Sequence, residues 1–171
     1  MEPGSSRPDG WQGLAPAVVG IEVVIADAAW RRLLPRAEML ARRAVAATLA
    51  AEGCEGAVTV LLTDDRALKR LNGEHRGKEK PTNVLSFPSD YGEHLGDIAL
   101  ALGVVRREAL AAGRRVEAHF AHLVAHGTLH LLGHDHLLAG EARVMEQAEA
   151  RIMARLRLPN PWKAPVGRLA A

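Results

Sequence analysis

Hydrophobic residues along the chain fall into short runs and longer helix-like repeats, separated by glycine, proline and charged residues. Short runs rich in β-branched residues predict strands, and longer stretches rich in Ala, Leu, Glu and Arg predict helices. The expected strands are 18–25, 57–62, 83–87 and 96–101, and the expected helices are 35–52, 64–71, 104–112, 116–132 and 139–156. This mixture predicts an α+β fold with about four strands and five or so helices.

The two ends of the chain differ from its middle. Residues 1–16 are rich in Gly, Pro and Ser and lack the apolar stretch of a signal peptide, so we expect a mobile N-terminal tail. Residues 17–158 form the predicted single domain, and residues 159–171, with three prolines, an irregular C-terminal tail. No segment reaches the roughly 18–20 consecutive apolar residues of a membrane span. We therefore expect a cytoplasmic protein without a membrane partner.

Composition narrows the possible functions. The 171 residues are 48% hydrophobic and 25% charged, which is typical of a soluble globular domain. The net charge is only +2, so a nucleic-acid surface would need local clusters of cations. Aromatic residues make up 4%, too few for a row of base-stacking side chains. The single cysteine, Cys54, excludes an internal disulfide and is typical of a reducing compartment.

Candidate chemistry is concentrated in the segment HGTLHLLGHDH, residues 126–136. His126 and His130 are four residues apart, so on a helix both imidazoles project from one face, the spacing with which a helix offers two ligands to zinc. Gly133 is placed to end the helix in a left-handed turn, after which His136 can complete a three-histidine site. Three neutral nitrogens leave one tetrahedral position of Zn²⁺ open for water, as in catalytic sites.

Four neighbouring residues have less certain roles. His134, in the turn, is expected to face solvent or to support the ligands from behind. Asp135 can orient a ligand imidazole by accepting its second N–H, or it can cap the following helix. His122, one turn before His126, is expected to form a wall of the site, and His119 to be a partly exposed helix residue.

The ligand spacing is shared with H-E-x-x-H metalloproteases, but the residue after the first histidine is not. Gly127 stands where those enzymes carry their glutamate base, so a peptidase mechanism lacks its proton acceptor. A zinc deaminase is disfavoured because the chain has no Cys-x-x-Cys pair.

The segment HGTLHLLGHDH strongly resembles the H-G-x-L-H-L-x-G-x-D-H signature of the YbeY family of endoribonucleases and rRNA maturation factors. Residues 71–88, LNGEHRGKEKPTNVLSFP, resemble that family's L-N-x-x-x-R-G-x-x-x-P-T-D/N-V-L-S-F-P segment, and residues 96–101 its G-D-I strand. The similarity extends over residues 21–162. His134 replaces the usual aromatic residue before Asp-His, a change that affects packing rather than ligation.

The resemblance implies a small mixed sheet flanked by helices, with the metal site on a helix and the turn after it. It implies one zinc ion held by His126, His130 and His136, and hydrolysis of single-stranded RNA. It also implies a role in 16S rRNA 3′-end maturation and ribosome quality control, with the 16S rRNA precursor and ribosomal particles as partners. The predicted catalytic residues are Arg76, which matches a functional arginine of the family, and the ligand His126.

Cations near Arg76 are consistent with an RNA substrate. A guanidinium binds phosphate through two parallel hydrogen bonds and stabilises charge on its oxygens. The alternative for Arg76 is a structural ion pair with a loop carboxylate, and the resemblance favours the functional role. Lys78 and Lys80 are expected to attract phosphate in general. The remaining cations of this stretch, Arg66, Lys69 and Arg70, belong to a charge run that is usually a solvated surface. Arg106, Arg107, Arg114 and Arg115 extend this surface or are ordinary helix-surface charges.

Two alternatives to a nuclease stay open from the sequence alone. One is a different metallohydrolase of the peptidase kind, and the other is a ribosome-assembly module in which zinc is structural. Metal content does not distinguish an assembly module from an enzyme, because both would bind zinc. Cleavage of RNA does distinguish them.

Overall fold

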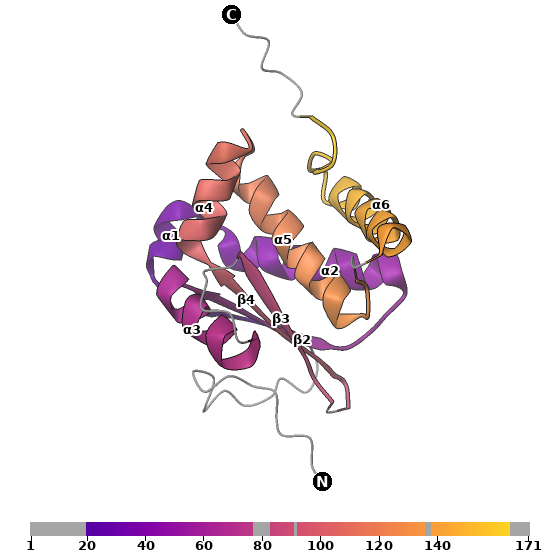
Figure 1. Ribbon diagram of the computed structural model, residues 1–171, viewed down its shortest axis with the longest axis horizontal. Helices are drawn as coiled ribbons and strands as arrows, with labels where there is room; N and C mark the ends of the chain where they lie inside the picture. The colour runs from indigo at the N-terminus through magenta and orange to yellow at the C-terminus, as the bar shows by residue number, and fades with distance from the viewer. Residues whose placement is uncertain (1–19, 77–82, 91, 136–137, 165–171) are drawn as a thin grey trace, which may run out of the picture.

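The computed structural model describes residues 20–76, 83–90, 92–135 and 138–164 (Figure 1). Within these ranges it has four strands and six helices, which confirms the predicted α+β class. The elements are β1 (Ile21–Ile25), α1 (Ala29–Leu33), α2 (Ala37–Glu52), β2 (Ala57–Thr63), α3 (Asp65–Arg76), β3 (Val84–Pro88), β4 (His94–Ala101), α4 (Leu102–Ala111), α5 (Val116–Leu131) and α6 (Ala139–Arg155). Residues 1–16, the predicted tail, lie outside the description, as do residues 165–171.

The four strands form one mixed sheet in the order β1-β2-β4-β3. β1, β2 and β4 are parallel, with Val60 of β2 paired to Val23 on one side and to Ile98 on the other. β3 is antiparallel to β4 and forms the edge, with Ser86 opposite Ile98. Crossovers between the parallel strands are made by helices, as parallel pairing requires.

Alternate residues of the strands face two separate cores. Val60, Ile98 and Leu100 point to the larger core, which is closed by α2, α5 and α6. Leu61 and Leu85 point the opposite way, to a smaller core closed by α3. This alternation follows from the two-residue period of a strand. Figure 1 shows α3 on one side of the sheet and α5 with α6 on the other.

Three local features differ from the sequence-based expectation. α1 is not predicted, because five residues are too few to show a helical period; burial of Trp30, whose Nε1 donates to the Thr63 carbonyl at 2.8 Å, holds it in place. α3 continues past Gly73, where we expected it to end, since this glycine has no left-handed backbone. β4 begins at His94, two residues earlier than expected.

None of the helices within the described ranges is both long and apolar enough to cross a membrane.

Candidate metal centre

Gly127 brings α5 unusually close to the sheet. A Cβ atom at this position would lie 2.9 Å from Ile98 Cγ2 and 3.2 Å from Ser86 Oγ, and the Ser86 hydroxyl donates to the Gly127 carbonyl at 3.0 Å. Position 127 therefore faces the core. H-E-x-x-H metalloproteases carry a glutamate at the position of Gly127. In this protein a side chain at that position would collide with the sheet and would not reach a metal site.

The histidines of α5 form a stripe on another face of the same helix. The ring centroids of His122 and His126 are 6.2 Å apart, and those of His126 and His130 are 4.6 Å apart. His126 and His130 approach each other through their Nε2 atoms, which are 3.1 Å apart. The predicted ligand pair therefore converges, as the four-residue spacing indicated.

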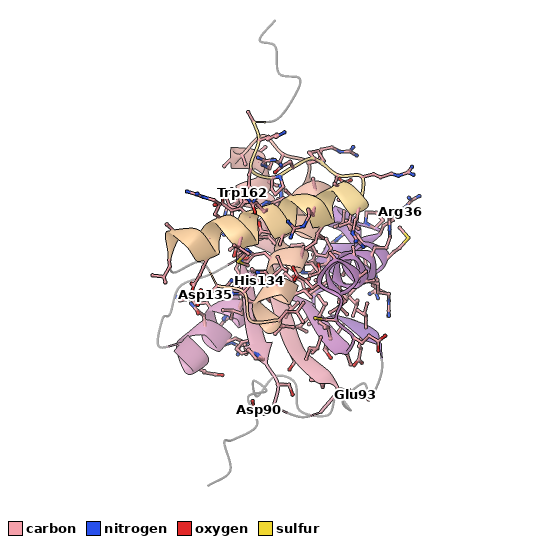
Figure 2. All side chains as sticks on the ribbon, turned by 90° about the vertical axis from the view of Figure 1, so that its right-hand side faces the viewer. Arg36, Asp90, Glu93, His134, Asp135 and Trp162 are labelled. Carbon is pink, nitrogen blue, oxygen red and sulfur yellow. The ribbon has the colours of Figure 1, made fainter. Side chains whose placement is uncertain are left out.

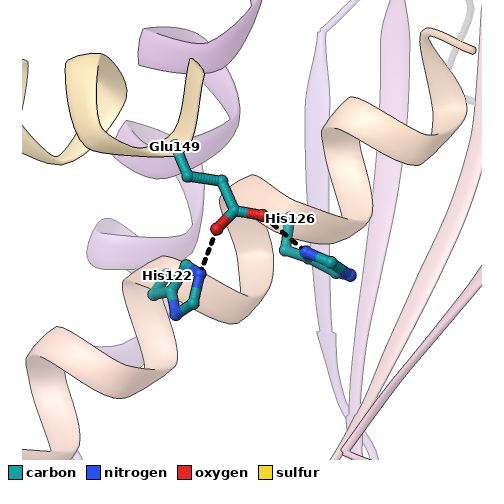
Figure 3. A group of neighbouring side chains, drawn as sticks. All are labelled: His122, His126 and Glu149. Atoms are coloured by element: carbon teal, nitrogen blue, oxygen red, sulfur yellow. Dashed lines mark hydrogen bonds and ion pairs between the residues drawn. The ribbon is translucent and has the colours of Figure 1, made fainter. Parts of the chain in front are cut away.

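Glu149 of α6 lies behind this stripe and is 1% exposed. Its Oε2 is 2.5 Å from His122 Nε2, and its Oε1 is 2.6 Å from His126 Nδ1 (Figure 3). Trp162 Nε1 donates to Oε2 at 3.0 Å. One buried carboxylate thus contacts three ring nitrogens from two segments of the chain.

The charge of Glu149 follows from these contacts. Burial alone would raise its pKa, but the hydrogen bonds and charges of His122 and His126 outweigh burial and lower the pKa to about 2. The carboxylate is therefore ionised at neutral pH. An ionised carboxylate only accepts hydrogen bonds, so His122 donates from Nε2 and His126 from Nδ1.

The donor set at this place is able to hold a metal ion. Ligand atoms of His122, His126 and Glu149 all lie within 4.8 Å of one another. The His126 and His130 Nε2 atoms fit a metal as well, because two nitrogens about 2.0–2.1 Å from a tetrahedral zinc ion are roughly 3.3 Å apart. Their observed separation of 3.1 Å is close to that value.

Two of the predicted functional residues cannot be placed fully. His136, the third predicted ligand, lies outside the described residues. The turn leading toward it has the predicted form, with a left-handed Gly133 (φ 95°) and a hydrogen bond from the His134 N–H to the Leu129 carbonyl at 3.0 Å. Arg76 is the last residue of α3, and its side chain lies outside the description.

Other residues near the stripe have structural partners. His134 is mostly buried rather than facing solvent, and its Nε2 pairs with Glu52 at the end of α2, at 3.2 Å. His119 Nε2 lies 2.9 Å from Glu108 Oε2, and its pKa is lowered because burial outweighs the hydrogen bond and charge of Glu108. Asp135 is exposed in the turn before α6 (Figure 2).

Two hollows with charged residues in their linings lie on the described surface. A hollow of about 500 Å³ on the exposed face of α3 is lined by Arg66, Lys69, Arg70, Gly73 and Glu74. A second hollow, of about 440 Å³, is lined by the turn after α5 and the start of α6.

Three of the four arginines in and after α4 contact other residues of the protein. Arg107 pairs with Asp65 at 2.8 Å, and Arg114 donates to the Pro161 and Lys163 carbonyls at 2.6 and 3.1 Å. Arg115 Nε lies 3.6 Å from Glu117.

Sequence reasoning did not find Glu149 or Trp162 as parts of this site. Glu149 is one of several acidic residues in a polar helix, 23 positions after His126, and no local spacing marks it. Trp162 lies in the predicted irregular tail. One general rule could have pointed to such a residue. Metal-binding histidines usually donate their second N–H to a carboxylate or carbonyl, so a buried acceptor is expected behind His126.

Fold and site together define an α+β protein with a histidine-bearing helix and a donor group able to hold a metal ion. A family model described as Endoribonuclease YbeY matches residues 25–157. The chain therefore belongs to the YbeY family, which confirms the resemblance seen in the sequence.

Individual relatives agree with this assignment. A protein of Gluconobacter oxydans named Endoribonuclease YbeY is 46% identical over 148 residues, covering 84% of this chain and 88% of that protein. A relative of the same name from Rhodopseudomonas palustris is 43% identical, covering 85% of this chain and 83% of that protein. The solution structure of TM1509 from Thermotoga maritima, 23% identical, superposes with a TM-score of 0.52 over 84% of this chain and 99% of its own, which shows the shared fold.

Proposed function

We propose that the chain is a zinc-dependent endoribonuclease that cleaves single-stranded RNA. Membership of the Endoribonuclease YbeY family supports RNA cleavage. The observation that carries the metal is the 3.1 Å approach of the His126 and His130 Nε2 atoms, with Glu149 on the opposite nitrogen of His126. His136 is the proposed third ligand. We further propose, from the family resemblance, a cytoplasmic role in 16S rRNA 3′-end maturation and ribosome quality control, acting on the 16S rRNA precursor and ribosomal particles.

The proposed division of labour assigns charge and orientation to this chain's residues. When bound, zinc would supply Lewis acidity toward a phosphate oxygen and an acidified water molecule. Arg76 would bind the scissile phosphate through two parallel hydrogen bonds from its guanidinium group and stabilise the negative charge that develops on the phosphate oxygens. The exposed cations Lys69 and Arg70 would raise the local concentration of RNA without contacting the reacting atoms.

The deciding experiment is single-turnover cleavage of defined RNAs by metal-stripped and zinc-restored protein. We expect cleavage of unpaired RNA only after zinc is restored. His126→Ala and His130→Ala should each lose zinc and activity, whereas the matched control His134→Ala should keep both, because His134 pairs with Glu52. Wild-type rates without metal would overturn the zinc mechanism.

The same experiment distinguishes the two other functions. Zinc-loaded protein that binds ribosomal particles but cleaves no RNA would establish an assembly module with structural zinc. A peptidase is disfavoured by the packing of position 127 against the sheet, which leaves no room there for a glutamate base.

A further inference from the structure

In the proposed metal site, on which the following role of Glu149 rests, His126 has to present one particular ring nitrogen to the ion. We propose that Glu149 is a positioning residue: it holds His126 as the tautomer with hydrogen on Nδ1 and thereby directs the Nε2 lone pair at the point shared with His130. A neutral imidazole carries hydrogen on one nitrogen and a lone pair on the other. Because Nδ1 lies 2.6 Å from the Glu149 carboxylate, the hydrogen belongs on Nδ1.

Distances show why Glu149 orients a ligand rather than serving as one. Its oxygens are 2.5 and 2.6 Å from His122 Nε2 and His126 Nδ1, which are hydrogen-bond lengths. Two donor atoms on one tetrahedral zinc ion would be roughly 3.3 Å apart, so these shorter contacts are hydrogen bonds, and Glu149 would have to move away from the two histidines to share an ion with them. The Nε2 atoms of His126 and His130 are 3.1 Å apart, which is close to the separation of two ligands on one zinc ion.

Three donors hold the carboxylate itself in place. His122 and Trp162 both donate to Oε2, and the edge of the Trp162 ring meets His122 with centroids 5.9 Å apart. The segment that carries Trp162 is fixed to the start of α5, because Arg114 donates to the carbonyls of Pro161 and Lys163. Trp162 lies next to α6 in Figure 2. Glu149 is therefore constrained by α5 and by the chain that follows α6.

Glutamine at position 149 breaks this arrangement although its shape is nearly the same. The glutamate offers two acceptor oxygens to three N–H donors. A glutamine offers one oxygen, and its NH₂ group would oppose at least one ring N–H. His126 would then be released to turn or to adopt the Nε2–H tautomer, which has no lone pair directed at the shared point. Loss of such a supporting partner typically costs 10–100-fold in metal affinity, roughly.

The test compares Glu149→Gln with Glu146→Gln, the same substitution one turn earlier on α6. The first measurement is the ring ¹⁵N spectrum of metal-free protein at alkaline pH, where histidines are neutral. The second is zinc affinity by competition with a chelator. We expect His126 to be the Nδ1–H tautomer in the wild type and in Glu146→Gln, and to lose that preference in Glu149→Gln. Zinc affinity should fall by about 10–100-fold in Glu149→Gln alone.

Each outcome separates this inference from the proposed function. An unchanged His126 tautomer together with unchanged zinc affinity in Glu149→Gln would overturn the positioning role. If that variant does not fold, the wild-type spectrum decides, because an Nε2–H tautomer at His126 contradicts the proposal by itself. If the wild type shows the Nδ1–H tautomer and binds zinc but cleaves no RNA, the proposed nuclease fails while the positioning role stands.

Discussion

The close approach of α5 to the sheet can be tested by adding one methyl group. In Gly127→Ala the new Cβ would lie 2.9 Å from Ile98 Cγ2, against about 3.5–4.0 Å for an ordinary carbon contact. Ile98 is fully buried, so α5 has to move outward by several tenths of an ångström. Overpacking of this kind costs about 1–3 kcal/mol, and the better helix propensity of alanine returns about 0.5–1 kcal/mol. We expect a net loss of about 1–2 kcal/mol in the free energy of unfolding.

Gly140→Ala in α6 is the matched control, since nothing lies within 4 Å of its added Cβ. It should be neutral or stabilising by up to about 1 kcal/mol. Urea unfolding at fixed zinc concentration measures both variants, provided the dependence on denaturant stays the same. Zinc affinity should also fall in Gly127→Ala, because α5 shifts relative to Glu149 on α6. Equal stability of Gly127→Ala and wild type would refute the tight contact.

Three further predictions follow from individual side chains. Arg76→Ala should keep zinc and stability but cleave RNA about a hundredfold or more slowly at saturating RNA, and Arg76→Lys should restore little of the rate. A single-turnover rate of Arg76→Ala equal to that of the wild type would exclude a role of Arg76 in the reaction. Lys69→Ala with Arg70→Ala should instead weaken RNA binding and flatten its dependence on salt, with little effect at saturating RNA, as measured by titration at several salt concentrations. His119 has a folded-state pKa below the ordinary 6.5, so the unfolded chain takes up this proton first and stability falls as the pH drops below about 6.5. His119→Gln should therefore lose less stability than the wild type over that range, as measured by the free energy of unfolding at a series of pH values. The same pH dependence in both proteins would contradict this role of His119.

The parts of the fold that the sequence predicted well have strong local signals. β2 is a continuous apolar run, and α5 ends where Gly133 supplies a left-handed turn, so both lie close to their expected positions. α1 depends instead on burial of Trp30 against the end of β2, a contact between residues 33 positions apart. The continuation of α3 through Gly73 was missed for a related reason: a glycine inside a helix costs only about 1 kcal/mol, and packing of Leu68 and Leu71 on the sheet outweighs it.

The same distinction between local and distant contacts divides the candidate site. His126 and His130 could be paired from the sequence because a helix converts a spacing of four residues into proximity. That spacing brings the two rings together but does not decide which nitrogen of each ring faces the other. In this protein the decision for His126 is made by a carboxylate on α6, whose place depends on how α6 packs on α5 and on the hydrogen bond from Trp162. Glu141 and Glu146 occupy the same helix without burial of this degree, so acidic composition alone could not have identified Glu149. A histidine motif therefore predicts where a metal can bind, whereas the buried acceptor behind it determines whether the rings are oriented to bind one.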